Sequence, residues 1–255
     1  MKMKLYEICF SPTGGTQKAA DILSKGIADK IQTVDLTDHS TDFSAISLAG
    51  EDTAVIAVPS YGGRVPAPAI DRLKSIKGNG ALAVLVCVYG NRAYEDTLIE
   101  LLDAANDAGF TVISAVAAIA EHSIARQFAA GRPDEADRKI LAEYAGKIRE
   151  KIISGNTSQP SVPGNRPYKK GGGSGMVPKP TKDCTQCGLC AEKCPVQAID
   201  KKEPKKVDGK TCISCMRCVS VCPQSARKIN AVMMTAVSTM LKKVCSDRKE
   251  CELYL

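Results

Sequence analysis

The sequence predicts an α/β fold, in which a doubly wound parallel sheet of five strands is followed by a second, small domain. Five short apolar runs alternate with helical stretches over residues 1–153, and eight of the twelve cysteines lie within residues 184–222. A chain of 255 residues with 44% hydrophobic and 25% charged residues has the composition of a globular protein and is long enough for two domains.

The five predicted strands are apolar along their length and mostly β-branched: 5–10, 31–36, 53–58, 81–88 and 111–119. Helices are expected between and after them at 16–29, 66–74, 94–108 and 133–153. The last helix opens with Pro133 and two acidic residues, which favour a helix start. Strands without polar alternation are buried on both faces, which is typical of a parallel sheet covered by helices.

Residues 154–182 are rich in glycine, proline and lysine. We interpret this segment as a linker, flexible at the glycine run 171–175, because it offers few side chains that can pack. A phosphate-binding turn is the alternative for the glycine run, but no strand is predicted before it and no helix after it. The linker separates a domain at 1–153 from a second domain at 183–226.

The second domain contains one cysteine motif twice, at residues 184–195 and 212–223, with identical spacing. Each copy reads C-x-x-C-x-x-C-x-x-x-C-P, which places three thiolates on one tight loop and a fourth at the following turn. Soft thiolates in this pattern favour an iron–sulfur cluster, whereas a structural zinc site usually takes two C-x-x-C pairs separated by a longer loop. A disulfide scaffold is disfavoured because no secretory signal is evident.

This segment resembles the bacterial two-cluster 4Fe-4S ferredoxins. The resemblance implies two 4Fe-4S clusters, each bound by three cysteines of one copy and the fourth cysteine of the other. The first cysteine set is then Cys184, Cys187, Cys190 and Cys222, and the second cysteine set is Cys212, Cys215, Cys218 and Cys194.

Another motif follows the first predicted strand, where Ser11, Thr13, Gly14, Gly15 and Thr16 lead into a helix. Free backbone N–H groups and the helix dipole at such a start stabilise a phosphate dianion, and glycines let the backbone approach it. The motif resembles the phosphate loop of flavodoxins. Their fold has the strand order 2-1-3-4-5 and binds FMN outside the carboxyl ends of the strands. The alternative is a capped helix start that binds nothing.

Two further loops agree with this resemblance. Tyr61 and Gly62 follow the third predicted strand, and Gly90, Asn91 and Tyr94 follow the fourth. Flavodoxins place aromatic side chains from these loops against the isoalloxazine ring. The resemblance therefore implies an FMN cofactor with these five residues around its ring.

Further residues outside these motifs are candidates for roles near the cofactors or are spectators. Tyr89 is the alternative to Tyr94 as a stacking residue, and His122 is either a proton-handling group near the flavin or a hydrogen-bonding loop residue. Cys245 and Cys251 are isolated, and we interpret them as spectators. Residues 227–255 are expected to form a C-terminal helix with one apolar face, followed by a tail.

The order of these parts resembles the flavodoxin–ferredoxin fusion proteins of anaerobes, the EFR1-type family, over nearly the whole chain. The resemblance implies an electron-transfer protein in which two 4Fe-4S clusters exchange electrons with bound FMN. We favour an electron carrier over a substrate-specific oxidoreductase, because the sequence shows no NAD fingerprint. The alternatives are a flavin-dependent oxidoreductase that reduces a quinone or nicotinamide, with the clusters as electron entry, and a flavin-free iron–sulfur module.

Charge is unevenly distributed, with a net charge of −3 on residues 1–153 and +10 on residues 154–255. Each oxidised 4Fe-4S cluster with its four thiolates carries about −2, so two clusters offset part of the basic excess. The remainder favours acidic redox protein partners, and we expect salt-dependent attraction between the two domains.

Other partners are disfavoured. Aromatic and basic residues do not interleave as a nucleic-acid platform requires. No apolar run approaches the length of a membrane span, so a cytoplasmic location is expected.

Overall fold

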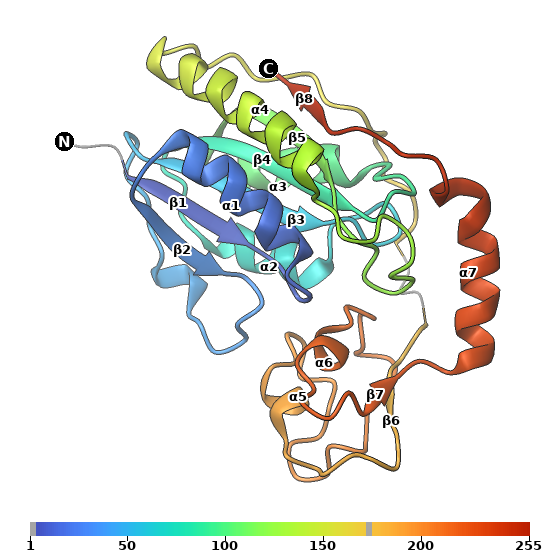
Figure 1. Ribbon diagram of the computed structural model, residues 1–255. Helices are drawn as coiled ribbons and strands as arrows, with labels where there is room; N and C mark the ends of the chain where they lie inside the picture. The colour runs from blue at the N-terminus through green and yellow to red at the C-terminus, as the bar shows by residue number, and fades with distance from the viewer. Residues whose placement is uncertain (1–3, 172–174) are drawn as a thin grey trace.

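The computed structural model describes residues 4–171 and 175–255, and the predicted flexible glycines 172–174 lie outside this part. Its centre is a six-stranded sheet in the order β2-β1-β3-β4-β5-β8 (Figure 1). The parallel strands are β1 (Leu5–Cys9), β2 (Ile31–Asp35), β3 (Thr53–Pro59), β4 (Leu82–Tyr89) and β5 (Thr111–Ile119). Every residue of β1 and β3 is buried, as expected for strands covered on both faces.

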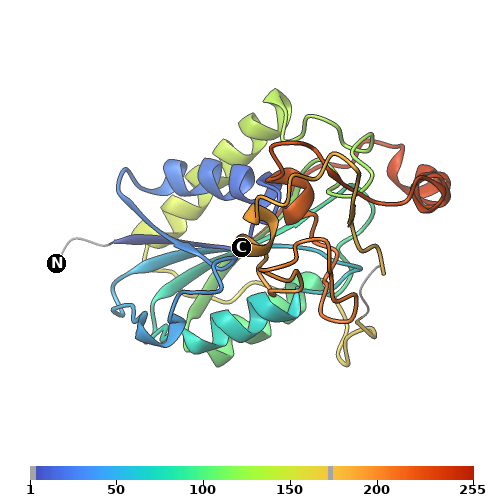
Figure 2. The ribbon, with the colours of Figure 1, turned by 90° about the horizontal axis from the view of Figure 1, so that it is seen from below.

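Helices cover both faces of the sheet, as Figure 2 shows from below. α1 (Gly15–Ile27) and α4 (Glu135–Ile153) lie on one face, where Leu23 and Leu141 share a buried cluster with strand residues. α2 (Ala67–Ser75), α3 (Thr97–Asp107) and the short 3-10 helix η1 (Phe43–Ala45) cover the other face through a second cluster. The predicted doubly wound α/β fold is confirmed.

The sheet has one strand more than the sequence predicts. β8 (Glu252–Tyr254) joins the edge of β5 in the antiparallel direction, with Ala115 opposite Tyr254. The predicted order 2-1-3-4-5 is correct for the parallel strands, but the prediction of a five-stranded sheet is wrong. The last residues of the chain pair with backbone groups that β5 would otherwise leave unpaired at the edge. A strand of three residues is too short to show a periodicity in the sequence.

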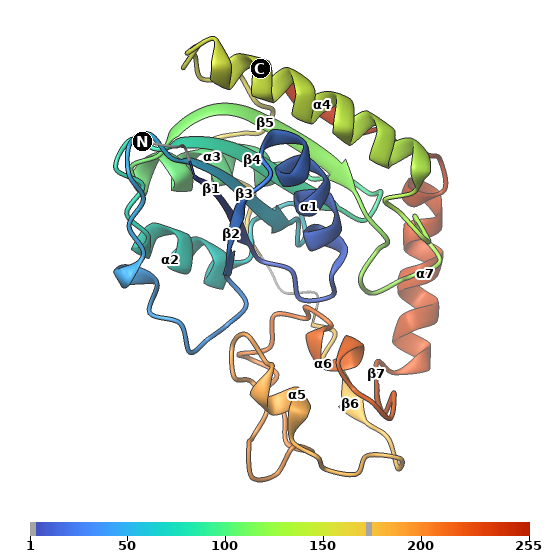
Figure 3. The same ribbon diagram turned by 60° about the vertical axis from the view of Figure 1, so that its left-hand side comes forward.

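Residues 183–226, here called the cysteine-rich domain, have little regular structure. α5 (Leu189–Glu192) and α6 (Arg217–Ser220) each contain the third cysteine of one motif copy. β6 (Lys179–Pro180) and β7 (Arg227–Lys228) pair antiparallel where the chain enters and leaves. Figures 1 and 3 place this domain next to the loop between β1 and α1.

α7 (Ala231–Cys245) runs along one side of the molecule and leads back from the cysteine-rich domain to the sheet (Figures 1 and 3). Its Leu241 and Cys245 pack on Ala125 and Phe128, which belong to the loop after β5. The predicted C-terminal helix is therefore present, and it holds this loop in place.

The segment after α4, which the sequence predicts to be a linker, packs against α3. Arg166 forms an ion pair of 2.5 Å with Asp103 of α3, and Asn165 N donates to Asp96 Oδ1 at 2.9 Å. A Cβ on Gly164 would lie 2.3 Å from Ile99 Cγ2, so the chain passes directly against α3. The expectation that this segment offers little for packing is wrong here, because its basic residues find acidic partners that lie far away in the sequence.

Candidate functional site

The four cysteines of the first set line one cavity in the cysteine-rich domain. Cys184, Cys187 and Cys190 come from the first motif copy, and Cys222 comes from the end of the second copy. Arg227 lines the same cavity. The fold thus brings Cys222 to the other copy's loop, as the ferredoxin resemblance implies.

The second set also gathers across the two copies. Burial raises the pKa of Cys212, and it raises the pKa of Cys215 and Cys218 to about 12. The charge of Cys194 adds to the rise at all three thiols, so Cys194 lies near them.

The two crossing cysteines have equivalent surroundings. Cys194 Sγ accepts a hydrogen bond of 3.3 Å from Ala198 N, and Cys222 Sγ accepts one of 3.3 Å from Ala226 N. Both bonds come from the backbone N–H four residues further on. The internal repeat of the sequence is therefore also a repeat of local structure.

The arrangement of the thiols suits iron–sulfur clusters. The four thiols of the first set line one common cavity, as the ligands of a 4Fe-4S cluster do. Thiolates on zinc all bind a single ion, whereas those around a 4Fe-4S cluster bind different irons and surround the cluster. A coordinating metal deprotonates a thiol outright, which offsets the cost of burying these thiolates.

The loop between β1 and α1 has the geometry of an anion-binding helix start. Gly14 precedes α1 with a φ of 87°, in the left-handed region that glycine adopts readily, and this N-cap residue has no side chain to cap the helix. Ser11 Oγ accepts a hydrogen bond of 2.9 Å from Gln17 N, which fixes the loop on the first turn. Ser11 and Thr16 are both buried.

The other residues of this loop face a cavity. Thr13 and Gly15 line a space of about 370 Å³, here called the Thr13 cavity, together with Lys18 of α1. Val219 and Ser220 of the cysteine-rich domain line it from the opposite side. The predicted phosphate loop thus faces a space between the two domains.

A second space of about 240 Å³, here called the Tyr61 cavity, lies at the carboxyl ends of β3 and β4. Tyr61 and Gly62 line it from one predicted ring loop, and Gly90 lines it from the other. Ser123 lines both the Thr13 cavity and the Tyr61 cavity, so the two spaces adjoin. One extended ligand with a phosphate at one end and a flat ring at the other would occupy both.

The cysteine-rich domain covers the Tyr61 cavity. Ile213 and Ser214, which line it, lie in the sequence between the cluster ligands Cys212 and Cys215. Ser214 is only 4% exposed, and its hydroxyl has no hydrogen-bond partner in the described structure. Because buried polar atoms nearly always have a partner, this hydroxyl indicates a ligand with a polar edge. The residues present therefore fit FMN.

Asn91 and Tyr94 do not reach this cavity. The Asn91 amide donates hydrogen bonds of 2.8 Å to the carbonyls of Cys245 and Asp247. The Tyr94 hydroxyl donates to Glu252 at 2.9 Å, and its ring packs on Tyr89 at 5.2 Å between centroids. The tail beyond α7 binds this loop and turns both side chains away from the position that the flavodoxin resemblance implied. Tyr89 is buried and does not line the cavity either.

His122 does line the Tyr61 cavity. Its Nδ1 accepts backbone N–H bonds from Ile124 at 3.2 Å and Ala125 at 3.1 Å, which leaves the ring proton on Nε2. Burial lowers the pKa of His122 from 6.5, and the charge of Arg92 lowers this pKa further. His122 is therefore a neutral imidazole that can donate from Nε2.

Sequence reasoning missed most of the lining of the Tyr61 cavity: Ser60, Ser123, Ile124, Met176, Ile213, Ser214, Val237, Met240 and Leu241. These residues come from both domains and from α7. Only the position of Ser214 between two cluster ligands could have drawn attention to it.

Hydrogen bonds to backbone carbonyls join the two domains. Arg217 donates to the carbonyls of Ser11 and Pro12 at 3.3 and 3.2 Å, and Arg72 donates to the carbonyl of Pro195. Within the described residues, no ion pair links 183–226 to the sheet domain. The expectation of salt-dependent attraction is not reflected in these contacts.

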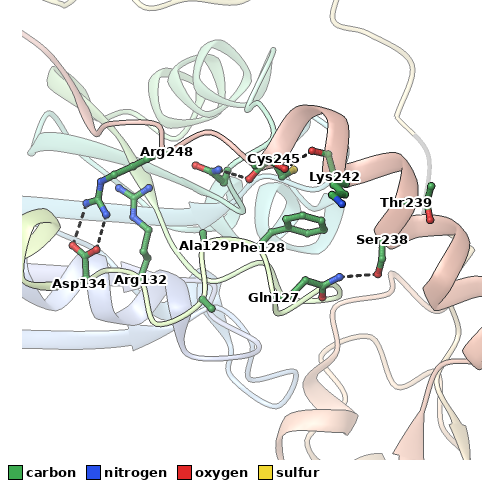
Figure 4. A pocket seen from close by; sticks show the side chains of 13 residues that line it. Gln127, Phe128, Ala129, Arg132, Asp134, Ser238, Thr239, Lys242, Cys245 and Arg248 are labelled. Atoms are coloured by element: carbon green, nitrogen blue, oxygen red, sulfur yellow. Dashed lines mark hydrogen bonds and ion pairs between the residues drawn. The ribbon is translucent and has the colours of Figure 1, made fainter.

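A third space, of about 640 Å³, lies between α7 and the loop after β5 (Figure 4). Apart from Lys242, its charged lining is paired. Arg248 binds Asp134 at 2.7 Å, and buried Arg132 is paired with Asp137. The hydroxyl of Ser238 accepts from Gln127 at 2.8 Å. These groups stabilise the contact of α7 and the tail with the sheet domain rather than presenting free donors to a ligand.

Comparisons with known proteins give separate matches for the cysteine-rich domain and for the sheet domain. The family of 4Fe-4S dicluster domains matches residues 183–226. A ferredoxin-like protein in the nif region of Sinorhizobium fredii is 47% identical over 47 residues, which is 16% of this chain and 73% of that protein.

Solved structures resemble the sheet domain. A flavodoxin from the domain Archaea matches with a TM-score of 0.42 and 15% identity over 59% of this chain and 99% of its own. A Streptococcus flavodoxin matches with a TM-score of 0.40 and 21% identity over 59% of this chain and 99% of its own. The flavodiiron core of Flv1 from Synechocystis matches with a TM-score of 0.43 and 15% identity over 60% of this chain, which spans only 37% of that structure.

No helix among the described residues is both long enough and apolar enough to cross a lipid bilayer.

Proposed function

The chain joins a sheet domain of flavodoxin-like topology to a domain that belongs to the 4Fe-4S dicluster ferredoxin family, and on this premise we propose that two 4Fe-4S clusters exchange electrons with FMN bound between the domains. Iron–sulfur and flavodoxin-like domains both point to electron transfer. The clusters supply one-electron transfer, and FMN takes one or two electrons, so the protein couples carriers of different electron number.

One observation carries this proposal. Ile213 and Ser214 form part of the wall of the Tyr61 cavity and belong to the same short loop as Cys212 and Cys215. The charge of Cys215 also raises the pKa of Tyr61, after burial as the larger cause, so the thiol lies near that ring. A cluster on the second cysteine set would therefore lie next to a flavin in the cavity.

The residues of the sheet domain have separate tasks in this proposal. Ser11, Thr13, Gly14, Gly15 and Thr16 bind the FMN phosphate through the backbone and hydroxyl groups of the helix start.

The ring of FMN lies in the Tyr61 cavity. Tyr61 and Gly62 contact it from the β3 loop, and Gly90 contacts it from the β4 loop. Ser214 and His122 offer polar groups to its edge. Asn91 and Tyr94 instead hold the tail in place, which stabilises the β4 loop from outside the cavity.

In this proposal the first cysteine set receives the external redox partner at its exposed side, while its Cys222 also lines the Thr13 cavity. Cys187 is exposed, whereas Cys215 of the second set is buried. Lys201, Lys202 and Lys205 are exposed on the same domain and favour a partner with an acidic surface. Electrons then pass between the partner and the first cluster, between the two clusters, and between the second cluster and FMN.

Anaerobic purification with iron, sulfide and flavin analysis tests the cofactors. We expect about eight irons, eight sulfides and one FMN per chain, because there are two four-iron sites and one flavin site. Iron and sulfide at these values without flavin would leave a flavin-free iron–sulfur module and overturn the proposed exchange.

Rapid reduction of the clusters, followed by flavin absorbance, tests the exchange itself. We expect a flavin reduction rate that does not depend on protein concentration, because both cofactors belong to one chain. The rate should change little between low and high salt, since hydrogen bonds rather than ion pairs join the domains. A rate proportional to protein concentration would show transfer between molecules and contradict the proposal.

A further inference from the structure

Arg227 of β7 is a buried cation without an acidic partner. It is only 2% exposed and is among the largest fully buried side chains of the chain. Across residues 4–171 and 175–255, no carboxylate forms an ion pair with it, although the other buried arginine, Arg132, is paired with Asp137. Burying an unpaired guanidinium is strongly unfavourable, so a negative group must compensate for it in the folded protein.

The contacts of Arg227 identify this negative group. Its Nη2 donates to Cys190 Sγ at 3.2 Å and to the carbonyl of Pro204, and its Nη1 donates to the carbonyl of Pro178 at 3.5 Å. Its Nε has no partner in the described structure. The carbonyls satisfy N–H groups but carry no net charge, so among its hydrogen-bond partners in the described part of the chain, the sulfur of Cys190 is the one that can supply a full negative charge.

Arg227 belongs to the site of the first cysteine set. It lines the cavity that Cys184, Cys187, Cys190 and Cys222 also line, and it donates to the sulfur of Cys190. The guanidinium is therefore next to the position of the first cluster.

We propose that Arg227 is the counter-cation of the first cluster and raises its reduction potential. Reduction adds one electron to a cluster, supplied by an external donor, and no bond is made or broken. The added negative charge is stabilised by a nearby guanidinium that water does not screen. This inference rests on the iron–sulfur part of the proposed function and does not depend on the flavin.

Potentiometric titration of the full chain, followed by electron paramagnetic resonance of each cluster, tests the inference. Arg227→Gln removes the charge, and Arg227→Lys keeps it. Lys228→Gln removes an exposed charge from the next residue and is the matched control. We expect Arg227→Gln to disfavour reduction of the first cluster at least tenfold, which is 59 mV for a one-electron couple. Arg227→Lys and Lys228→Gln should each cause less than half of this shift.

Two results would overturn the inference. Potentials that stay unchanged in Arg227→Gln would make Arg227 a structural tie between Pro178 and Pro204. An equal shift in Lys228→Gln would show a general effect of domain charge. The iron and sulfide content of the wild type separates this outcome from a failure of the proposed function, because a protein without two four-iron clusters contradicts the latter first.

A measurement on the wild type covers the case in which Arg227→Gln does not assemble its clusters. Electron–nuclear double resonance of reduced protein labelled with ¹⁵N-arginine should detect arginine nitrogen coupled to the first cluster, because Nη2 lies 3.2 Å from Cys190 Sγ. Arg227→Lys should lose this coupling. Absence of any arginine coupling in the wild type would contradict the inference without reference to a variant.

Discussion

The imidazole of His122 lies directly against Gly90, so that a Cβ on Gly90 would be 2.6 Å from His122 Cδ2. The two residues come from the loops after β5 and β4, and both line the Tyr61 cavity. The imidazole of His122 therefore leaves no room for a side chain at Gly90. A larger residue would push the imidazole into the space that we assign to the flavin ring.

We expect Gly90→Ala to weaken FMN binding at least tenfold, about 1.4 kcal/mol, while the iron content stays unchanged. Titration of flavin-depleted protein with FMN, followed by flavin fluorescence, measures the affinity. Gly146→Ala is the matched control, because a Cβ at Gly146 meets no atom within 4 Å. Equal affinities for Gly90→Ala and the wild type would remove the ring from this cavity.

The crossed arrangement of cysteines predicts an effect on the other motif copy. Cys194→Ala should damage the cluster of Cys212, Cys215 and Cys218 and leave the one on Cys184, Cys187 and Cys190. Electron paramagnetic resonance after partial reduction distinguishes the two centres. Cys245→Ala, outside both sets, should retain both signals. Loss of only the centre on Cys184, Cys187 and Cys190 would refute the crossing.

His122 predicts a pH dependence of stability. Its pKa is lower in the folded protein than its ordinary value of 6.5, so the unfolded chain binds a proton first as the pH falls. The stabilising effect of the neutral imidazole is complete above pH 6.5 and decreases as the pH approaches the folded-state pKa. We expect the wild type to lose thermal stability relative to His122→Asn between pH 7.5 and about 5. His39→Asn, at a partly exposed position in the loop after β2, is the control. Parallel curves for wild type and His122→Asn would contradict this prediction.

Two arginines near the ring loops should differ in their effect on the flavin. Arg92 lines the Tyr61 cavity and forms a partly exposed ion pair of 2.9 Å with Glu95, whereas Arg64 is not part of the cavity lining, pairs with Glu100 at 2.6 Å and stacks on Tyr168. Arg92→Gln should lower the two-electron potential of FMN by about 30 mV, a tenfold change, because a cation near the ring favours the anionic reduced form. Arg64→Gln should leave the potential near that of the wild type. Spectroelectrochemical titration measures both, and identical potentials in all three proteins would place Arg92 too far from the ring.

Local sequence patterns were sufficient for several features. Continuous apolar runs predicted the five parallel strands, because burial on both faces requires them. The repeated cysteine spacing predicted two sulfur sites, since three thiolates on one tight loop depend only on local chain geometry. Gly14 and Ser11 predicted the helix start for the same reason, because their conformation and hydrogen bonds involve neighbouring residues.

Tertiary structure alone decided the rest. Ser214 reaches the Tyr61 cavity, and Asn91 and Tyr94 leave it, because contacts across more than 100 residues determine both outcomes. The tail could become β8 only because β5 lies at the edge of the sheet, which no local pattern reveals. In the sequence, nothing distinguishes Arg227 from the other basic residues of its basic segment. The burial of Arg227 next to Cys190, without an ion pair to any carboxylate of the described residues, is a property of the folded chain. The free energy of a charge depends on the groups that surround it.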